Sequence, residues 1–216
     1  MNNDTKEHIE KYGHSVIKIE GTLYLPPFAY SIGLLETYNH PEIICFGLSL
    51  NILHTLINDI AENIKSGINY YPEKVYDNIF RSKKAKFLSV NQNNISDYFG
   101  AAIEYYNKKD FPAIQLVWPD INNKLPWEED FEKKYQYFQP LLDRNYKFKF
   151  REEPLLRIIT TSQHIDNGMP ITHVVHDKNG DWQFLTDIFS NKDARIIGLG
   201  EIVENDQTLN ELIGNK

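Results

Sequence analysis

A short stretch early in the chain gathers side chains that could carry acid–base chemistry or hold a ligand. His40 and Glu42 could form a general acid–base pair, because imidazole titrates near neutral pH and a nearby carboxylate raises its pKa. Small residues on one face of residues 28–34 would permit close approach of a ligand or of another strand. The residues of this first candidate site are Tyr30, Ser31, Gly33, Glu36, His40 and Glu42. In the structural alternative, His40-Pro41 shapes a turn and Glu42 caps or pairs locally.

A second candidate site is formed by two tryptophan motifs, Trp118-Pro119-Asp120 and Pro126-Trp127-Glu128. Two indoles flanked by carboxylates could form the walls of a pocket for a flat ligand, through stacking and hydrogen bonds. They could equally attach a long loop to a sheet, with Asp120 starting a turn. Residues 120–134 are rich in charge and aromatic rings, so we expect a loop that packs against the protein.

A third cluster, near the end of the chain, has the residue types of a metal site. It contains His173, His176, Asp177 and Asp181. Residues three apart on a strand point to opposite faces, so the two histidines would not converge, and a closed zinc site needs four converging ligands. We therefore expect no metal here, and we interpret residues 177–181 as a hairpin turn with Trp182 packed across it.

The composition excludes several classes of function. The formal net charge is −7 and the basic residues are scattered, so duplex nucleic acid, which requires clustered Lys and Arg, is not an expected partner. The densest basic group, from Arg144 to Arg151, is followed at once by Glu152 and Glu153. The Gly-Lys-Ser phosphate loop, the Gly-x-Gly-x-x-Gly fingerprint and the Gly-x-Ser-x-Gly elbow are missing, so ATP use, a classical dinucleotide fold and esterase chemistry are unsupported.

The single cysteine and the hydropathy pattern indicate a reduced, cytoplasmic setting. Cys45 lies in an apolar run, where a buried and inert thiol is expected, and one cysteine allows no intramolecular disulfide. The polar start of the chain has no apolar segment of signal-peptide type. The longest apolar stretch, from Ile43 to Ile57, is interrupted by polar residues, so we expect no membrane span.

Periodicity predicts the elements that must position these residues. Alternation predicts strands over residues 14–20, 28–34, 42–48, 85–90 and 113–118, and helical spacing predicts two main helices, over residues 52–66 and 93–106. A C-terminal region then holds strands over residues 155–161, 171–176 and 182–185, the last two forming a hairpin. It ends with residues 195–203 and a short helix.

Several of these segments follow one another in a recognisable order. They begin with Tyr12-Gly13-His14-Ser15-Val16-Ile17 and Pro27-Phe28-Ala29-Tyr30-Ser31-Ile32-Gly33-Leu34. The others are His40-Pro41-Glu42-Ile43-Ile44-Cys45-Phe46-Gly47-Leu48, Gln115-Leu116-Val117-Trp118-Pro119-Asp120 and Leu125-Pro126-Trp127-Glu128. Together they resemble the bacterial domain-of-unknown-function family 4262 over about residues 12–128. The later His176-Asp177 and Gly180-Asp181-Trp182-Gln183-Phe184-Leu185 resemble a tail that accompanies such domains. The resemblance implies a bacterial cytoplasmic setting and no particular activity.

These observations predict an α+β fold with a mostly antiparallel sheet or a split-barrel-like core. We expect a family-4262-like domain over residues 1–150 and a small β-rich unit over residues 151–216 that packs on it.

Two functions stay open. One is a non-catalytic interaction or accessory protein, possibly immunity-like, whose net charge suits a basic protein partner. The other is a small-molecule or flavin-type site between residues 30–33, His40 and the Trp118–Trp127 loop. A homodimer would cover strand edges.

Overall fold

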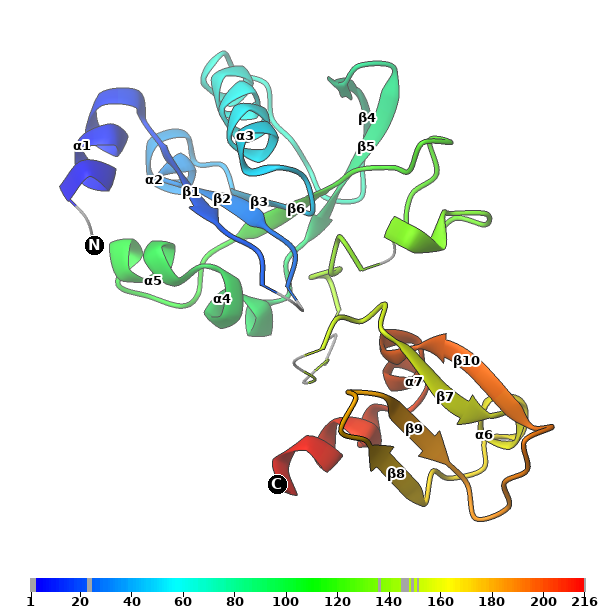
Figure 1. The fold of residues 1–216 in the computed structure, drawn as a ribbon. Coiled ribbons are helices and arrows are strands. Elements are labelled where there is room, and N and C mark those ends of the chain that lie inside the picture. The colour runs from blue at the N-terminus through cyan, green and yellow to red at the C-terminus, as the bar shows by residue number, and fades with distance from the viewer. Residues whose placement is uncertain are drawn as a thin grey trace. The chain divides into compact units, whose positions relative to one another are not determined.

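The protein was analysed as a computed structural model that describes residues 3–22, 25–135, 137–144, 148, 150 and 152–215. The chain forms two compact units, Met1–Tyr146 and Lys147–Lys216, each with its own sheet (Figure 1). Most of the basic group between residues 144 and 151 lies outside the described residues. The fold is α+β, as predicted, and neither sheet closes into a barrel.

The first unit is built on a mixed six-stranded sheet in the order β1-β2-β3-β6-β5-β4. The strands are β1 (Ser15–Ile19), β2 (Phe28–Ile32), β3 (Glu42–Phe46), β4 (Val75–Phe80), β5 (Lys83–Ser89) and β6 (Ala113–Val117). Only the central pair, β3 and β6, is parallel, so the sheet is mostly antiparallel. Strands β2, β3 and β6 are buried along their whole length, which accounts for their predominantly apolar sequences.

One face of this sheet is covered by α3 (Leu50–Lys65), which packs against β1, β2 and β3 (Figure 1). Its apolar stripe is buried: Leu53, Leu56, Ile57, Ile60, Ala61 and Ile64. The helix ends at Lys65, and Gly67 just beyond it has a φ of 96°, the left-handed conformation in which a glycine commonly terminates a helix. Burial of such a stripe contributes roughly 1.5–3 kcal/mol for each large side chain.

The other face is covered by two short helices and a long loop. The helix predicted over residues 93–106 is in fact two helices, α4 (Gln92–Tyr98) and α5 (Gly100–Tyr106). The break lies at Phe99, whose φ of −115° is not helical and whose buried ring packs in the core. The helical spacing continues across the break, so it could not reveal it. The side chain of Asn91 caps α4 by accepting from the N–H of Asn93.

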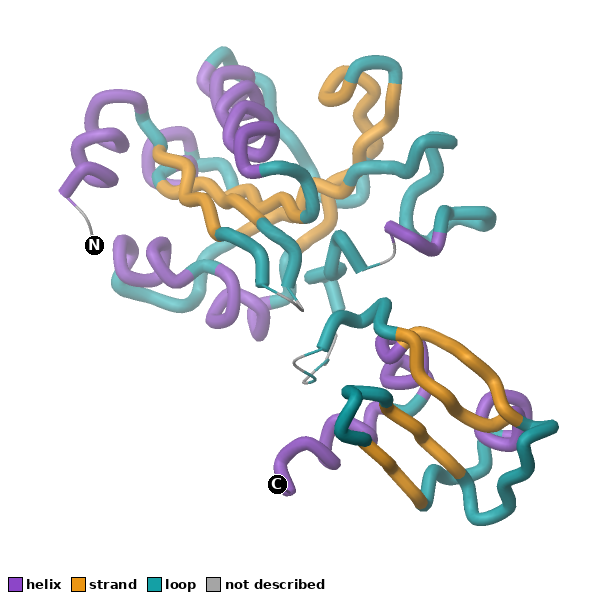
Figure 2. Tube along the Cα trace, viewed as in Figure 1, coloured by secondary structure: helices purple, strands orange, loops and turns teal. Residues whose placement is uncertain are grey.

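Two further helices of the first unit were not predicted. Helix α1 (Asn3–Tyr12) is polar and buries Ile9, while α2 (Leu34–Tyr38) has five residues and begins where β2 was expected to continue. In the described part of residues 118–144 the chain is loop apart from the short η1 (Lys133–Tyr135) (Figure 2). Leu125 of this loop packs with Leu88 of β5 and Val117 of β6, so the loop covers that part of the sheet.

The second unit has a four-stranded sheet in the order β10-β7-β9-β8. Its elements are β7 (Arg157–Thr161), α6 (Ser162–Asn167), β8 (His173–His176), β9 (Trp182–Leu185), β10 (Ala194–Gly198), α7 (Leu199–Asn205) and η2 (Gln207–Asn215). The predicted hairpin of β8 and β9 is confirmed. Residues 195–203 divide between β10 and α7. The unit has its own core: Phe150, Ile158, Phe184, Leu199, Ile202, Val203 and Leu209.

Every helix within the described residues is too short or too polar to cross a lipid bilayer.

Candidate functional site

The carboxylate of Glu42 lies at the centre of the first candidate site. It sits at the start of β3, and its neighbours come from the end of β2, the start of α2 and the end of α5. The side chains of Glu42 and Ser31 are both inaccessible to solvent. Tyr106, the last residue of α5, reaches the same carboxylate with its hydroxyl group.

Four hydrogen bonds hold this carboxylate. Glu42 Oε2 accepts from the Ser31 hydroxyl group at 2.5 Å, and Oε1 accepts from the Tyr106 hydroxyl group at 2.5 Å. The backbone N–H groups of Gly33 and Leu35 also donate to Oε1, at 3.0 and 3.1 Å. Ser31 Oγ in turn accepts from the N–H of Ile43 at 2.8 Å, so the hydroxyl group is fixed between the two strands.

Burial raises the pKa of Glu42 above its ordinary value, although the hydrogen bonds from Ser31, Tyr106, Leu35 and Gly33 oppose the shift. Burial and the neighbouring carboxylate also raise the pKa of Tyr106, so its hydroxyl group stays protonated and serves as a donor. The site is a closed, satisfied polar network in the interior.

The role of this network is to close the N-terminus of α2. The N-cap position is Gly33, which has no side chain to cap the helix and has a φ of 103°. Glu42 supplies the missing acceptor from the neighbouring strand, because the N–H groups of Gly33 and Leu35 both point to it. This geometry agrees with the structural alternative for Glu42.

His40 makes contacts different from those of Glu42. Its Nδ1 lies 2.8 Å from the carbonyl oxygen of Pro41, and its Nε2 accepts from the N–H of Tyr70 at 3.2 Å. Since Nε2 accepts, the proton of the neutral ring is on Nδ1, which donates to Pro41. Burial lowers the pKa of His40, and the hydrogen bond from Nδ1 to the carbonyl oxygen of Pro41 opposes the shift. The His40 ring therefore connects the turn at His40-Pro41 with the segment before β4, through its hydrogen bond with Tyr70.

Tyr30 and Glu36 complete the first set, one in the interior and one on the surface of the protein. The ring of Tyr30 is buried with Phe28 and Phe99 under α5, and its hydroxyl oxygen accepts from the N–H of Ala101 at 3.1 Å. Glu36 is exposed on α2, where its Oε2 accepts from the Tyr105 hydroxyl group at 2.5 Å. Of the six residues, the structure brings Ser31, Gly33 and Glu42 together.

The two tryptophans of the second site lie in different environments. Trp118 is only 8% exposed, and its indole N–H donates to the carbonyl oxygen of Phe46 at 2.7 Å. Gln139 also binds the backbone of Trp118, through both ends of its amide. Trp127 is 39% exposed, and the ammonium group of Lys86 lies 5.3 Å from its ring centroid. Trp118 thus attaches the loop to the sheet, while Trp127 faces solvent.

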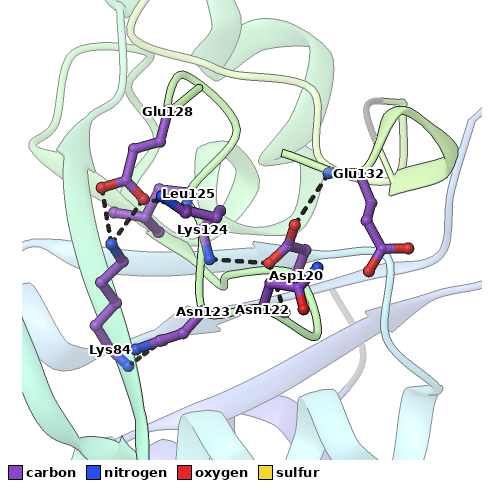
Figure 3. A network of polar contacts seen from close by, with 8 residues as sticks. All are labelled: Lys84, Asp120, Asn122, Asn123, Lys124, Leu125, Glu128 and Glu132. Atoms are coloured by element: carbon purple, nitrogen blue, oxygen red, sulfur yellow. Dashed lines mark hydrogen bonds and ion pairs between the residues drawn. The ribbon is translucent and has the colours of Figure 1, made fainter. Parts of the chain in front are cut away.

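Asp120 organises the turn that follows Trp118 (Figure 3). Its Oδ1 accepts from the N–H groups of Asn122 and Lys124, and its Oδ2 accepts from the N–H of Glu132. Burial alone would raise the pKa of Asp120, but these three donors and the charge of Lys83 hold it below its ordinary value. The carboxylate is 1% exposed and ties both ends of the loop together.

Glu128 closes the same loop from the other side (Figure 3). Its carboxylate forms an ion pair with Lys84 Nζ at 2.6 Å and accepts from the N–H of Leu125 at the same distance. Lys84 first, and then the N–H of Leu125, lower the pKa of Glu128. The backbone of Lys84 also donates to Asn123 Oδ1 at 2.9 Å, so β5 holds the loop at two points.

The family to which the chain belongs follows from comparison with known families. The family model described as "Domain of unknown function (DUF4262)" matches residues 8–132, more than half of the chain. The chain belongs to this family. The resemblance seen in the sequence motifs is thereby confirmed. Searches of the curated proteins and of the solved structures give no significant match.

All the residues of the first and second sites lie within the DUF4262 match. Sequence reasoning missed several of their partners: Tyr106, Gln139, Lys84 and Tyr70. These residues are distant in sequence from the groups they bind, so no local spacing points to them. A glycine directly after a strand is a local signal of close backbone approach. Gly47 follows β3, has a φ of 77° and lies against the backbone of Phe138 in the long loop. A Cβ there would lie 2.3 Å from the carbonyl oxygen of Phe138.

The third cluster lies beyond the DUF4262 match. His176 stacks on Trp182 with ring centroids 4.0 Å apart, and His173 Nδ1 lies 2.9 Å from Thr172 Oγ1. Asp177 Oδ1 accepts from the N–H groups of Asn179 and Asp181, as a turn residue does. In the part of the chain that the structure describes, no three His, Cys, Asp or Glu side chains are placed to hold a metal ion.

Proposed function

We propose that this DUF4262 protein is a non-catalytic interaction protein. The observation that carries this proposal is that Ser31, Glu42 and Asp120 are buried and hydrogen-bonded within the fold. A general acid, base or nucleophile must reach its substrate, and these groups are both inaccessible and committed to protein partners. The residues that could act on another molecule are therefore those of the surface.

The surface that best fits a protein partner is the open edge of the six-stranded sheet at β4. This strand is last in the sheet order, and most of its residues are exposed or half-buried. Large apolar side chains surround its start: Tyr71 is 57% exposed, Val75 47% and Trp127 39%. Val75 lies opposite Lys86 in the β4–β5 ladder, and Lys86 lies over the ring of Trp127, so this β4 patch is continuous.

An edge strand beside exposed rings suits a partner that adds a strand of its own. Backbone hydrogen bonds would supply affinity, and Val75 and Trp127 would contact the partner's side chains. The register shift between Tyr76 and Phe80 limits regular pairing to the first part of β4. The formal net charge of −7 favours a basic partner, because opposite charge accelerates encounter. An immunity-like or accessory role in the cytoplasm is compatible with such binding.

Affinity capture with surface variants tests the proposal. The wild-type chain and the variants Val75→Asp and Trp127→Ser would be immobilised and exposed to native bacterial lysate at physiological salt. Ile121→Ser is the matched control, since Ile121 is 63% exposed in the Asp120 turn. We expect proteins that the wild type and the control retain and both β4 variants lose. Absence of a protein that depends on this patch would contradict the proposal.

A small-molecule or flavin-type site between residues 30–33, His40 and the Trp118–Trp127 loop is the weaker proposal. Tyr30 belongs to the buried cluster beneath α4 and α5, whereas Trp118 belongs to the cluster beneath α3, so the two rings serve different faces of the sheet. A flavin site also needs several phosphate donors. Titration of the purified protein with flavin mononucleotide, followed by flavin fluorescence, would support this alternative if emission were quenched at equimolar protein.

A further inference from the structure

A groove on the first unit lies apart from the three candidate sites and the β4 patch. It is formed by α1, β1 and α3 and has a volume of about 420 Å³, within the range of small-molecule sites. Its lining includes three imidazoles and several oxygen acceptors. The lining residues are Asp4, Thr5, His8, Tyr12, His14, Ser15, Val16, Ile17, His54, Asn58 and Glu62.

His14 is the buried group at this groove, with 6% of its surface exposed. Its Nε2 lies 2.9 Å from Oδ1 of Asn58, and the Asn58 amide is oriented by its Nδ2, which donates to the carbonyl oxygen of His54 at 2.9 Å. Because Oδ1 can only accept, His14 Nε2 carries the proton of the neutral ring. His14 Nδ1 is then an acceptor.

This acceptor has no hydrogen-bond partner within the described protein, although Nδ1 is buried. A buried polar atom without a partner is costly, and most such atoms are satisfied by protein, water or ligand. In contrast, Glu42 and Asp120 are fully engaged. The groove thus contains a buried acceptor, Nδ1 of His14, whose direction is fixed by the bond to Asn58. An N–H or O–H group of a ligand could donate to it.

The charged and titratable groups that face His14 decide what kind of donor fits. Helix α1 contributes Asp4, His8 and Tyr12, the β1 segment contributes Lys18, and α3 contributes His54 and Glu62. Partial burial, and then the charges of Lys18, His14 and His8, lower the pKa of His54. Of the residues that line the groove, Asp4 and Glu62 bear carboxylates, and the ammonium group of Lys18 is close enough to act on His54. Glu62 also has an exposed ion pair with Lys65 at 3.5 Å, which reduces its field only slightly.

We propose that this groove binds a small primary ammonium compound. Its N–H groups donate to His14 Nδ1 at the buried end, and the carboxylates of Asp4 and Glu62 attract its positive charge. An anion is disfavoured because it would face both carboxylates and the lone pair of Nδ1. This site is separate from the β4 patch, so it does not depend on the proposed function.

Titration with putrescine tests this site. We expect ¹H–¹⁵N chemical-shift changes confined to α1, the start of β1 and α3, together with a shift of the His14 Nδ1 resonance. The matched probe 1,4-butanediol, which has the same length and no charge, should bind at least about tenfold more weakly, which is about 1.4 kcal/mol. Equal binding of the diol, stronger binding of inorganic phosphate, or no shift with putrescine at millimolar concentration would overturn the proposal.

The pH dependence gives an independent readout. A protonated His14 ring would carry a donor at Nδ1 in place of the acceptor, so putrescine should bind more weakly in acid than at neutral pH. Binding that is unchanged or stronger at the lower pH would contradict the role given to His14.

Surface variants keep the test independent of folding, because His14→Ala could disturb the core. Glu62→Gln and Asp4→Asn alter exposed carboxylates of the groove and should each weaken putrescine binding several-fold. Asp59→Asn is the control, since this exposed carboxylate lies on α3 but does not line the groove. Equal affinity in all three variants would overturn the proposal. So would a Zn²⁺ titration that shifts the same imidazoles and abolishes putrescine binding.

Discussion

Glu42 and Asp120 are two buried carboxylates whose environments shift their pKa values in opposite directions. Their exposed fractions are 0% and 1%, so solvent access does not distinguish them. Glu42 lies between two strands and two helices, where burial outweighs its four donors. Asp120 lies in a turn with three backbone N–H donors and Lys83 nearby, and these outweigh burial. The comparison shows that donor geometry and local charge, rather than depth, decide the state of a buried acid.

The largest effect is expected from Glu42→Ala. It would leave the N–H groups of Gly33 and Leu35 and two hydroxyl groups without their acceptor, and α2 would lose its cap. We expect a loss of about 3–5 kcal/mol in the free energy of unfolding, because several buried N–H and O–H donors would lose one shared acceptor. Denaturant unfolding would measure it, with the exposed Glu36→Ala as control. A loss below about 1 kcal/mol would show that the network is dispensable.

Glu42 and Asp120 should also give opposite pH dependences of stability. Because the folded pKa of Glu42 is raised, its contribution is complete below the unfolded value of about 4.3 and is lost as the pH rises through the folded value. The folded pKa of Asp120 is lowered, so its contribution is present above the unfolded value of about 3.9 and is lost as the pH falls through the folded value.

Unfolding curves for the wild type, Glu42→Gln and Asp120→Asn across the acid range would measure both contributions. The stability difference between the wild type and Glu42→Gln should shrink as the pH rises. The difference between the wild type and Asp120→Asn should shrink as the pH falls. Parallel profiles for the two variants would remove the distinction between these carboxylates.

A smaller effect is expected at His40. Burial lowers its folded pKa, so the stability that it contributes is present above the unfolded value of about 6.5 and is lost as the pH falls through the folded value. Protonation would place a second N–H against the N–H of Tyr70. We expect His40→Ala to lose about 1–2 kcal/mol at pH values above 7, and less in mild acid. The exposed His8→Ala, measured in the same way, is the control.

The smallest effect on stability is expected from Trp127→Ala. Its ring is substantially exposed and contacts the ammonium group of Lys86, so its removal should change the free energy of unfolding by less than about 0.5 kcal/mol. Trp118→Ala would instead remove a buried ring and its hydrogen bond to Phe46, at a cost of about 3–5 kcal/mol. Thermal unfolding of the two variants side by side would show whether the indoles differ as their environments indicate.

Much of the fold was predictable because local patterns carry it. The apolar stripe of α3, the strands β2, β3 and β6 and the hairpin of β8 and β9 each have a period or a turn signal in their own residues. The split of the second helix at Phe99 was not predictable, because its apolar spacing continues through the break. Helix α2 was missed because its cap comes from Glu42 on another strand.

The candidate site shows the same division. The sequence by itself determined which residues are polar within apolar strands, and thereby singled out Ser31 and Glu42, and it marked Asp120 by its place beside Trp118. Only the tertiary structure decided what those groups contact: Tyr106, Lys83 and the backbone of α2 reach them from distant parts of the chain. Side-chain type is a local property, whereas the satisfaction of a buried charge depends on donors that folding brings together.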